Sequence, residues 1–308
     1  MIENLPTGAD TIPAMTTTAE REAYYRLARD LKIKGSVIEM GAWLGASTAY
    51  IAAGIKDSGA DRKLHVYDRW VWDPSHTRKV KDWRHHHRGD GYRDGPVPDA
   101  NSMFATFKEN LGPLIDLVDV HRGEISNVFW RAGPIALMIM DAPKRRREIS
   151  RALTAFGHSI VPGARMAWQD FAHFPSYEIV ACLHRLGDYI TFDEGVAPGT
   201  TAIFTVRHTW PSSAVSEAAF AAAAWSPDEI LTVWDSYARR LPEPMRARFR
   251  CGAALFLCDT GRAAEGRMAL REILRTSADE VLPKWRYLKE HRSNLASRYA
   301  PLFDELPC

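Results

Sequence analysis

Cysteine is scarce in this sequence, and its spacing excludes several classes of protein. The 308 residues contain four cysteines, none of them in a CxxC pair: Cys182, Cys251, Cys258 and Cys308. A disulfide framework or a zinc ribbon needs more cysteines at closer spacing. Because such scarcity is typical of a reducing compartment, we expect a cytoplasmic protein.

Charge of one sign and long apolar runs are lacking too. Lys and Arg number 40 against 38 Asp and Glu, a net charge of +2, which gives no basis for nucleic-acid binding over the whole surface. No uninterrupted apolar stretch is long enough to span a bilayer, and the amino terminus lacks the pattern of a signal peptide. We therefore expect neither nucleic acid nor membrane as a partner.

The composition is that of a globular protein with a full core. Hydrophobic residues make up 46% of the chain and charged residues 25%. The length exceeds the size at which a single core stops growing, so we expect one domain of ordinary size with an appendage.

Strand-like and helical patterns alternate through residues 1–209. The strand-like runs cover residues 36–40, 64–67, 117–120, 135–140, 164–168, 189–192 and 202–206. Helical patterns begin at the Thr17 and Glu20 capping box and continue at 47–55, 102–111, 145–157 and 177–186. Parallel strands need helical crossovers, so this order predicts an α/β fold with a doubly wound, mostly parallel sheet. The last two runs, joined by the short loop 195–199, predict a terminal antiparallel hairpin.

Residues 210–308 have no strand-like run, which predicts an all-α C-terminal domain. Helical patterns can be drawn over residues 213–224, 227–240, 243–258, 262–275 and 278–298.

One segment of the first domain, residues 69–100, is irregular and rich in Trp, His, Lys and Arg. A connection of this length inside a compact fold is uncommon, and is often a lid or a binding loop. It leaves the second strand at the edge where α/β sheets bind ligands. We expect an insert that covers the site on the acceptor side; a structural excursion or a subunit contact is the alternative.

The first strand runs into a glycine loop and a helix, in the segment Val-Ile-Glu-Met-Gly-Ala-Trp-Leu-Gly-Ala-Ser over residues 37–47. Glycines let the backbone approach a ligand at the carboxyl end of a strand, where the next helix also presents free amide groups. The spacing is not the GxGxxG dinucleotide fingerprint. The second strand ends in Asp68, where a carboxylate can accept hydrogen bonds from both hydroxyls of a ribose.

These motifs resemble those of the class I S-adenosylmethionine-dependent methyltransferases over about residues 20–207. The ExGxxxGxS form is similar to that of the catechol, caffeoyl-CoA and macrolide-sugar O-methyltransferases. The resemblance implies an S-adenosylmethionine site with its methionine part near Glu39, Gly41, Gly45 and Ser47. It places the ribose at Asp68 and the adenine near Gly123 and Glu124, with Asp141 at the border of the cofactor.

The resemblance also implies a divalent cation, since many such enzymes bind Mg²⁺ through carboxylates after the fourth and fifth strands. Here those positions carry Asp141, Gln169 and Asp170. Gln169 departs from the family pattern because an amide replaces a carboxylate. Two interpretations stay open: a weak magnesium site, or polar strand ends that contact solvent or the acceptor.

Methyl transfer to an alcohol needs a proton acceptor. The resemblance points to Lys144, in Asp-Ala-Pro-Lys at 141–144, and His173 is a second candidate, with Asp170 beside both in the catalytic set. Three arginines follow Lys144, which favours a solvated basic helix start as the alternative.

The sequence therefore predicts O-methylation of a small-molecule or sugar-derived hydroxyl. Two other classes remain open: a non-catalytic S-adenosylmethionine-binding or assembly protein, and a nicotinamide-dependent oxidoreductase. A homo-oligomer is compatible with the sequence.

Overall fold

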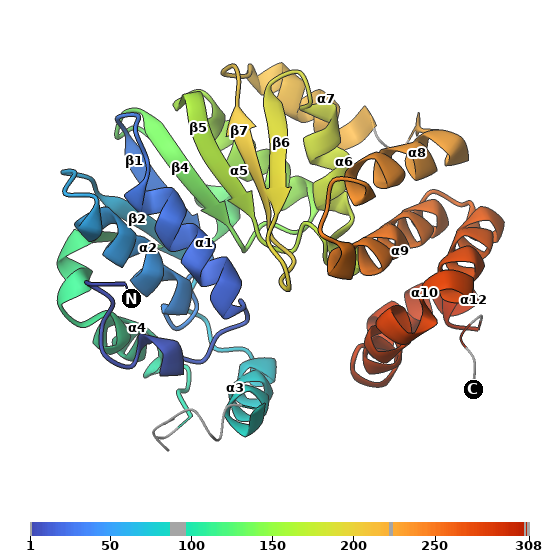
Figure 1. The fold of residues 1–308 in the computed structure, drawn as a ribbon, viewed down its shortest axis with the longest axis horizontal. Coiled ribbons are helices and arrows are strands. Elements are labelled where there is room, and N and C mark those ends of the chain that lie inside the picture. Colours follow the sequence, from blue (N-terminus) through green and yellow to red (C-terminus); the bar gives the residue numbers. More distant parts are fainter. Residues whose placement is uncertain (1, 87–96, 222–223, 305, 307–308) are drawn as a thin grey trace.

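The computed structural model describes residues 2–86, 97–221, 224–304 and 306, and it contains a seven-stranded sheet (Figure 1). The strand order is β3-β2-β1-β4-β5-β7-β6. The strands are β1 (Ser36–Met40), β2 (Leu64–Asp68), β3 (Val118–Arg122), β4 (Ile135–Met140), β5 (Ile160–Trp168), β6 (Ile190–Gly195) and β7 (Ala202–Val206). Strand β7 is antiparallel to both of its neighbours and the other pairs are parallel. The predicted mostly parallel sheet and its terminal hairpin are confirmed.

Helices cover both faces of the sheet. Neighbouring residues of β1 show why: Val37 and Ile38 are both fully buried but belong to different apolar clusters, one on each face. One cluster includes α1 (Thr18–Arg29), α2 (Ala46–Asp57) and α4 (Met103–Leu111). The other includes α5 (Arg146–Gly157), α6 (Glu178–Arg185) and α7 (Ser212–Ala221). Short 3-10 helices lie at Ala9–Thr11, Gly112–Leu117, Ile125–Asn127 and Phe174–Ser176.

Five helices of the described chain follow α7. They are α8 (Pro227–Ala238), α9 (Glu243–Asp259), α10 (Ala263–His291), α11 (Ser293–Arg298) and α12 (Ala300–Phe303). Helix α10 joins the predicted helices 262–275 and 278–298 across a kink at Ser277, whose φ of −147° is not helical. The predicted end at residue 298 is wrong, because the chain leaves α10 at Arg292 with φ −136° and starts a new helix there.

These C-terminal helices share a core with the sheet. Phe249 of α9 stacks on Phe171 at 5.5 Å between ring centroids, and Trp285 of α10 stacks on Phe174 at 5.0 Å. Both partners lie in the loop that follows β5. The helices therefore pack directly against a segment next to the strand ends.

Helix α1 is hydrogen-bonded to the loop between β6 and β7. Thr17 and Glu20 form the predicted capping box. Glu20 Oε1 also accepts hydrogen bonds from the backbone N–H groups of Thr200 (2.8 Å) and Thr201 (3.0 Å), in the loop between β6 and β7. One buried carboxylate thus closes the helix start and holds the hairpin loop.

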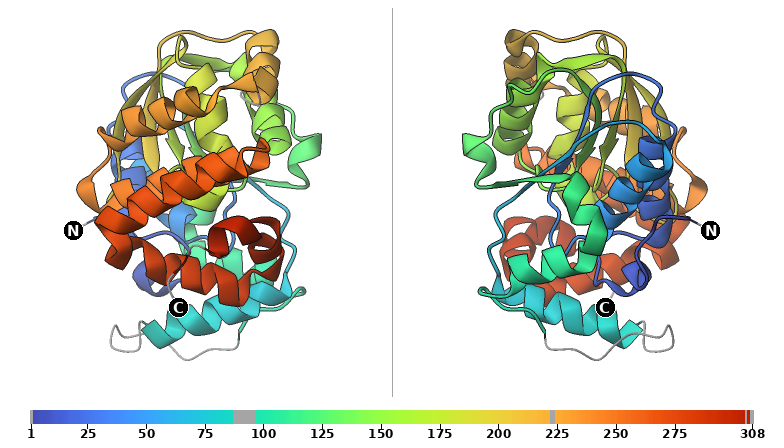
Figure 2. Two further views of the ribbon diagram at one scale, coloured as in Figure 1. Left: turned by 90° about the vertical axis from the view of Figure 1, so that its right-hand side faces the viewer. Right: turned by 90° about the vertical axis from the view of Figure 1, so that its left-hand side faces the viewer.

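The insert differs from the expected irregular segment, because Pro74–His86 forms a helix, α3. Asp73 explains its start: its side chain accepts the N–H of Ser75 at 2.8 Å, and Pro74 has the fixed φ that suits a first helical position. In Figures 1 and 2, α3 and the end of α10 lie at the same end of the molecule, below the strand ends. The rest of the insert, residues 87–96, lies outside the described residues.

Among the cysteines, Cys182, Cys251 and Cys258 are free thiols, and Cys308 lies outside the described residues. Within the described ranges, every helix is too short or too polar to cross a membrane.

Candidate functional site

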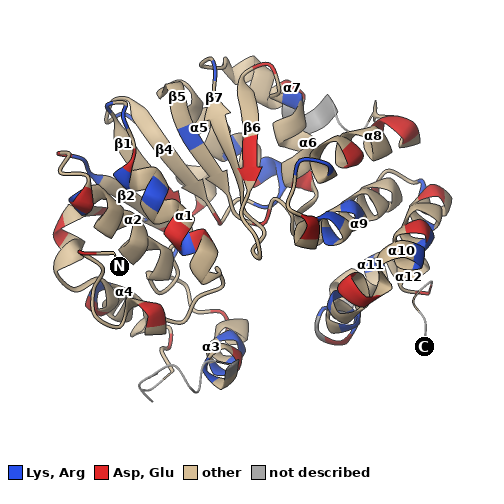
Figure 3. Cartoon of the chain, in the orientation of Figure 1, with Lys and Arg blue, Asp and Glu red and all other residues tan. Residues whose placement is uncertain are grey.

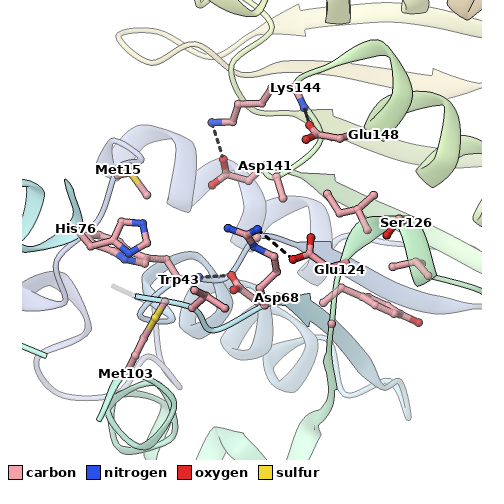
Figure 4. Close-up of a pocket in the computed structure, with 18 residues that line it drawn as sticks. Met15, Trp43, Asp68, His76, Met103, Glu124, Ser126, Asp141, Lys144 and Glu148 are labelled. Atoms are coloured by element: carbon pink, nitrogen blue, oxygen red, sulfur yellow. Dashed lines mark hydrogen bonds and ion pairs between the residues drawn. The ribbon is translucent and has the colours of Figure 1, made fainter. Parts of the chain in front are cut away.

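A pocket of about 480 Å³ opens at the carboxyl ends of β1, β2, β3 and β4 (Figure 4). This is the edge where open α/β sheets bind ligands, and the volume suits a small molecule or cofactor. Its wall includes the predicted residues Gly41, Asp68, Gly123, Glu124, Asp141 and Lys144. It also includes residues that the sequence did not single out for this site: Met15, Trp43, Tyr67, Met103 and Glu148.

Two glycines shape the loop after β1. Gly41 has φ 94°, and a Cβ at this position would lie 2.9 Å from the amide nitrogen of Ala142. Gly45 has φ 90° and precedes α2, where a Cβ would press on the ring of Phe107 at 3.0 Å. Both positions therefore exclude a side chain, and the first lets the ends of β1 and β4 meet closely.

Asp68 holds this loop. Its Oδ2 accepts the N–H groups of Ala42 (2.9 Å) and Trp43 (3.0 Å), and its Oδ1 accepts the N–H of Trp70 (2.7 Å). A carboxylate has about four lone-pair positions, so Oδ1 keeps one for a ligand hydroxyl. The loop explains part of the role of this aspartate, which the sequence had assigned to ribose alone.

Glu39 lies beneath the pocket and not in its wall. It is fully buried and accepts hydrogen bonds from the hydroxyls of Ser47 and Thr48, each at 2.6 Å. Burial raises the pKa of Glu39 to about 8. Gly45 and Ser47, expected beside the methionine part of the cofactor, are likewise absent from the described pocket wall. In this structure Glu39, Gly45 and Ser47 support the glycine loop after β1 and do not line the described pocket.

Gly123 and Glu124 lie in the wall as expected for the adenine end. The N–H of Gly123 donates to the backbone carbonyl of Asp68 at 3.0 Å, which fixes the chain after β3 against the end of β2. Glu124 pairs with Arg69 at 3.1 Å, and both side chains are more than half exposed.

Lys144 bridges two carboxylates. Its Nζ pairs with Asp170 and lies 3.6 Å from Asp141 Oδ1. Burial alone would lower the pKa of Lys144, but the two carboxylates outweigh it and raise that pKa above its ordinary value. Burial raises the pKa of Asp141 to about 7. Burial also opposes ionisation of Asp170, yet the charge of Lys144 prevails and lowers its pKa. With a raised pKa, Lys144 is protonated in this structure, and its role as the base that the resemblance implies stays a prediction.

The predicted magnesium ligands do not form a metal site in this arrangement. The ammonium of Lys144 lies between Asp141 and Asp170, where a cation would have to bind. Gln169 is buried, and its Oε1 has no hydrogen-bond partner among the described residues. In the part of the chain that the structure describes, no three His, Cys, Asp or Glu side chains gather as metal ligands. Magnesium therefore does not fit these residues as they lie.

His173, the second candidate base, lies beside Asp170 and not in the wall of the described pocket. Its Nδ1 is 3.8 Å from Asp170 Oδ2 and 3.3 Å from Ser176 Oγ. Burial lowers the pKa of His173 to about 4, so the ring is neutral at pH 7.

The insert contributes His76 to the pocket wall. Its ring lies 5.7 Å from that of Trp43 and 5.2 Å from that of Trp72. The aromatic content of the insert was a usable signal for this contact. Trp43 and Met15 had no such signal, because their position depends on the φ of 48° at Trp43 and on the path of the amino terminus.

No family model matches the sequence, and no curated protein matches it significantly. Among solved structures, the O-methyltransferase NovP is 15% identical, with a TM-score of 0.48 over 64% of this chain and 83% of its own. CalS11, a TDP-rhamnose 3′-O-methyltransferase, is 14% identical, with a TM-score of 0.37 over 60% of this chain and 76% of its own. An rRNA methylase from Streptococcus thermophilus is 13% identical, with a TM-score of 0.35 over 63% of this chain and all of its own.

The strand order, the reversed β7 and the pocket at the strand ends together define the fold class. The chain has the fold of the class I S-adenosylmethionine-dependent methyltransferases. The assignment of the fold rests on the strand order and strand directions, and the function must be argued from the site.

Proposed function

We propose that this protein binds S-adenosylmethionine in the pocket at the strand ends and transfers its methyl group to a hydroxyl of a small molecule. The observation that carries the proposal is the chemistry of the wall. Four carboxylates, Asp68, Glu124, Asp141 and Glu148, line a pocket that opens beside a glycine loop. This acceptor-rich wall fits a ligand with positive charge and hydroxyl donors.

The same wall argues against a nicotinamide cofactor. A dinucleotide places its pyrophosphate on the free amides of the glycine loop. Here the N–H groups of Ala42 and Trp43 already donate to Asp68, whose negative charge would repel a pyrophosphate. S-adenosylmethionine carries a sulfonium and an ammonium instead, so the carboxylates favour it.

The residues divide into two groups. Asp68, Gly123 and Glu124 hold the nucleoside end, with Asp68 Oδ1 as the acceptor for a ribose hydroxyl. Asp141 and Lys144 lie on the other side, where the acceptor must approach the methyl group that the bound cofactor presents. Alignment there converts an encounter into a unimolecular step.

Asp141 takes the proton of the acceptor hydroxyl in this proposal. It lines the pocket, whereas His173 does not, and Lys144 already carries its proton. The ammonium of Lys144 donates a hydrogen bond to the acceptor oxygen and orients it. No divalent cation is needed in this scheme, because Lys144 supplies the positive charge between the two aspartates.

The test is a calorimetric titration with S-adenosylhomocysteine, with NADH titrated in parallel. We expect binding of the first ligand alone. Asp68→Asn should weaken binding by about 1 to 2 kcal/mol, because one oxygen acceptor is lost from the site. The exposed Asp61, in the loop before β2, provides the matched control Asp61→Asn, which should bind normally.

A screen of hydroxyl compounds with labelled S-adenosylmethionine then tests catalysis. Turnover that is lost in Asp141→Asn, with S-adenosylhomocysteine binding retained, supports the assignment of the base. Binding of the cofactor with no turnover on any acceptor would favour a non-catalytic binding protein. Binding of NADH alone would refute the proposal.

A further inference from the structure

A second pocket, of about 560 Å³, lies among the C-terminal helices and shares no wall residue with the pocket at the strand ends. Its wall is formed by side chains from residues 227–235 of α8, 247–253 of α9 and 265–277 of α10. Helix α9 packs against both α8 and α10, and Figure 1 shows the three helices in this order. We call this pocket the C-terminal groove.

The sequence of α9 explains why the groove is open. Helix α9 contributes Ala247 and Ala253, both buried, whose side chains are too small to fill the space between the flanking helices. On α8, the ring of Trp234 packs against Phe249 and Phe256 of α9, at 6.4 Å and 5.6 Å between ring centroids. Large rings therefore hold the helices together, while small side chains keep the groove between them open.

Apolar side chains are exposed along the groove. Met268 of α10 is 65% exposed and Leu231 of α8 is 36% exposed, and the nearly buried Trp234 and Ile273 line the same wall. Apolar surface in contact with water is unfavourable, and a partner that covers it gains binding energy. Methionine is also a flexible side chain that suits binding surfaces.

The charges of the groove wall are mainly negative, and Figure 3 shows acidic positions on α8 and α10. The wall holds four carboxylates and one cation: Asp228, Asp235, Glu265 and Glu272, with Arg250. Asp228 and Glu265 form no ion pair with another described residue. Asp235 pairs with Arg250, and Glu272 pairs with Arg275, but these side chains are between 42% and 72% exposed. Ion pairs this exposed contribute little, so the groove wall favours a cationic partner.

The groove has the length of a short helix. From residue 265 to residue 277, α10 rises by about 18 Å at about 1.5 Å per residue, which corresponds to about three turns of a bound helix. At Ser277, where φ is −147°, α10 bends and the straight part of the wall ends. A helix bound along a groove contacts it through apolar residues at positions i, i+3, i+4 and i+7.

We propose that the C-terminal groove binds a basic amphipathic helix of a partner protein. The apolar face of that helix covers Leu231 and Met268, and its Lys or Arg side chains pair with Asp228 and Glu265. This inference goes beyond the proposed function and does not depend on it, because the groove and the pocket at the strand ends share no residue.

The first experiment is a fluorescence-anisotropy titration of the full-length protein against a labelled synthetic peptide. The peptide has about 18 residues, with Leu on one face of the helix and Lys on the other. We expect it to bind, and we expect a peptide with Glu in place of Lys not to bind. Added salt should weaken the binding, because salt screens ion pairs between exposed charges. Equal binding of the two peptides would overturn the proposal.

Substitutions of the exposed apolar residues test where the peptide binds. Leu231→Ser and Met268→Ser should each raise the Kd of the Lys peptide by about tenfold, the loss expected for one apolar contact. The matched control is Phe129→Ser, because Phe129 is 69% exposed and lies outside the groove. This control should bind the peptide as the unmodified protein does.

Substitution of a carboxylate tests the charge. Glu265→Gln should raise the Kd by about threefold, since an exposed ion pair contributes little. The control is Glu243→Gln, at an exposed residue of α9 outside the groove wall. Glu265 also lies in the first turn of α10, where a carboxylate stabilises the helix, so melting temperatures are measured for every variant.

Unchanged peptide affinity in Leu231→Ser and Met268→Ser, with normal melting temperatures, would overturn the proposal. Sedimentation of the unmodified protein provides the last test. Self-association that Met268→Ser abolishes would also overturn the proposal, in favour of a second copy of this chain as the occupant of the groove.

Discussion

Glu39 is a carboxyl group enclosed beneath the glycine loop, with two hydroxyls as its partners. Enclosure favours its neutral form, and this raises its pKa from the ordinary value of 4.5 to about 8. Between pH 4.5 and about pH 8, the folded protein therefore keeps a proton on Glu39 that the unfolded chain has released.

Stability should fall as the pH rises through that window. The folded state binds more protons than the unfolded state there, so the free energy of unfolding decreases with pH, by a few kcal/mol between about pH 5 and pH 8. Urea denaturation across this range measures the slope. Glu39→Gln, which cannot ionise, should flatten it, and an unchanged slope in that variant would contradict the assignment.

Lys144 compensates the charges of Asp141 and Asp170, so its removal should affect both carboxylates. Lys144→Ala leaves Asp141 and Asp170 as neighbouring like charges and removes the donor proposed for the acceptor oxygen. We expect turnover to drop by at least about tenfold, with S-adenosylhomocysteine binding retained. Lys56→Ala, on the far end of α2, serves as the control.

The same ion pairs predict how the proposed methyl transfer responds to chelators. Since the ammonium of Lys144 lies between the carboxylates, EDTA should leave the initial rate of methyl transfer unchanged. A rate that EDTA abolishes and Mg²⁺ restores would show that the lysine gives way to a metal ion during turnover.

At the scale of the element, α1 depends on the carboxylate of Glu20, which caps the helix and also binds the loop between β6 and β7. Glu20→Ala removes the capping box and the hydrogen bonds to Thr200 and Thr201 together. The expected loss of stability is about 2 to 4 kcal/mol, the sum of a cap and of buried backbone donors left unpaired. The control is Glu22→Ala, exposed on the same helix, which should change little. Thermal or urea unfolding of the two variants makes the comparison.

The sequence predicted those elements whose patterns are local. The strand at 36–40, the glycine turn at Gly41 and the capping box at Thr17 each rest on a few adjacent residues, and each is present. Helix α3 is not among the predicted elements, although Asp73 and Pro74 carry a start signal for it. The charge state of Lys144 could not be predicted, since it depends on Asp170, 26 positions away in the sequence.

At the scale of the whole molecule, the sequence pattern changes at residue 210, but the hydrophobic core continues across this position. Phe171, Phe174 and Tyr177 are almost fully buried, and their ring partners are Phe249, Trp285 and Phe256 of the C-terminal helices. Side chains from both sides of residue 210 therefore pack in one hydrophobic cluster.

The protein should therefore unfold as one unit. Calorimetry of the full chain is expected to give a single transition. A chain that ends at residue 209 should be aggregation-prone, because it would expose this aromatic surface to water. Two separate transitions, or a stable and monomeric 1–209 fragment, would show that the two parts fold independently.

The bond between α1 and the hairpin loop has a consequence for how the chain is made. The partners of Glu20 follow it by 180 and 181 positions, so nearly the whole sheet must be synthesised before they exist. While the protein emerges from the ribosome, the first helix has its own cap and can pack on α2, but its partners in the hairpin loop are still missing. The hydrogen bonds from Thr200 and Thr201 to Glu20 are thus among the last contacts of α1 that can form.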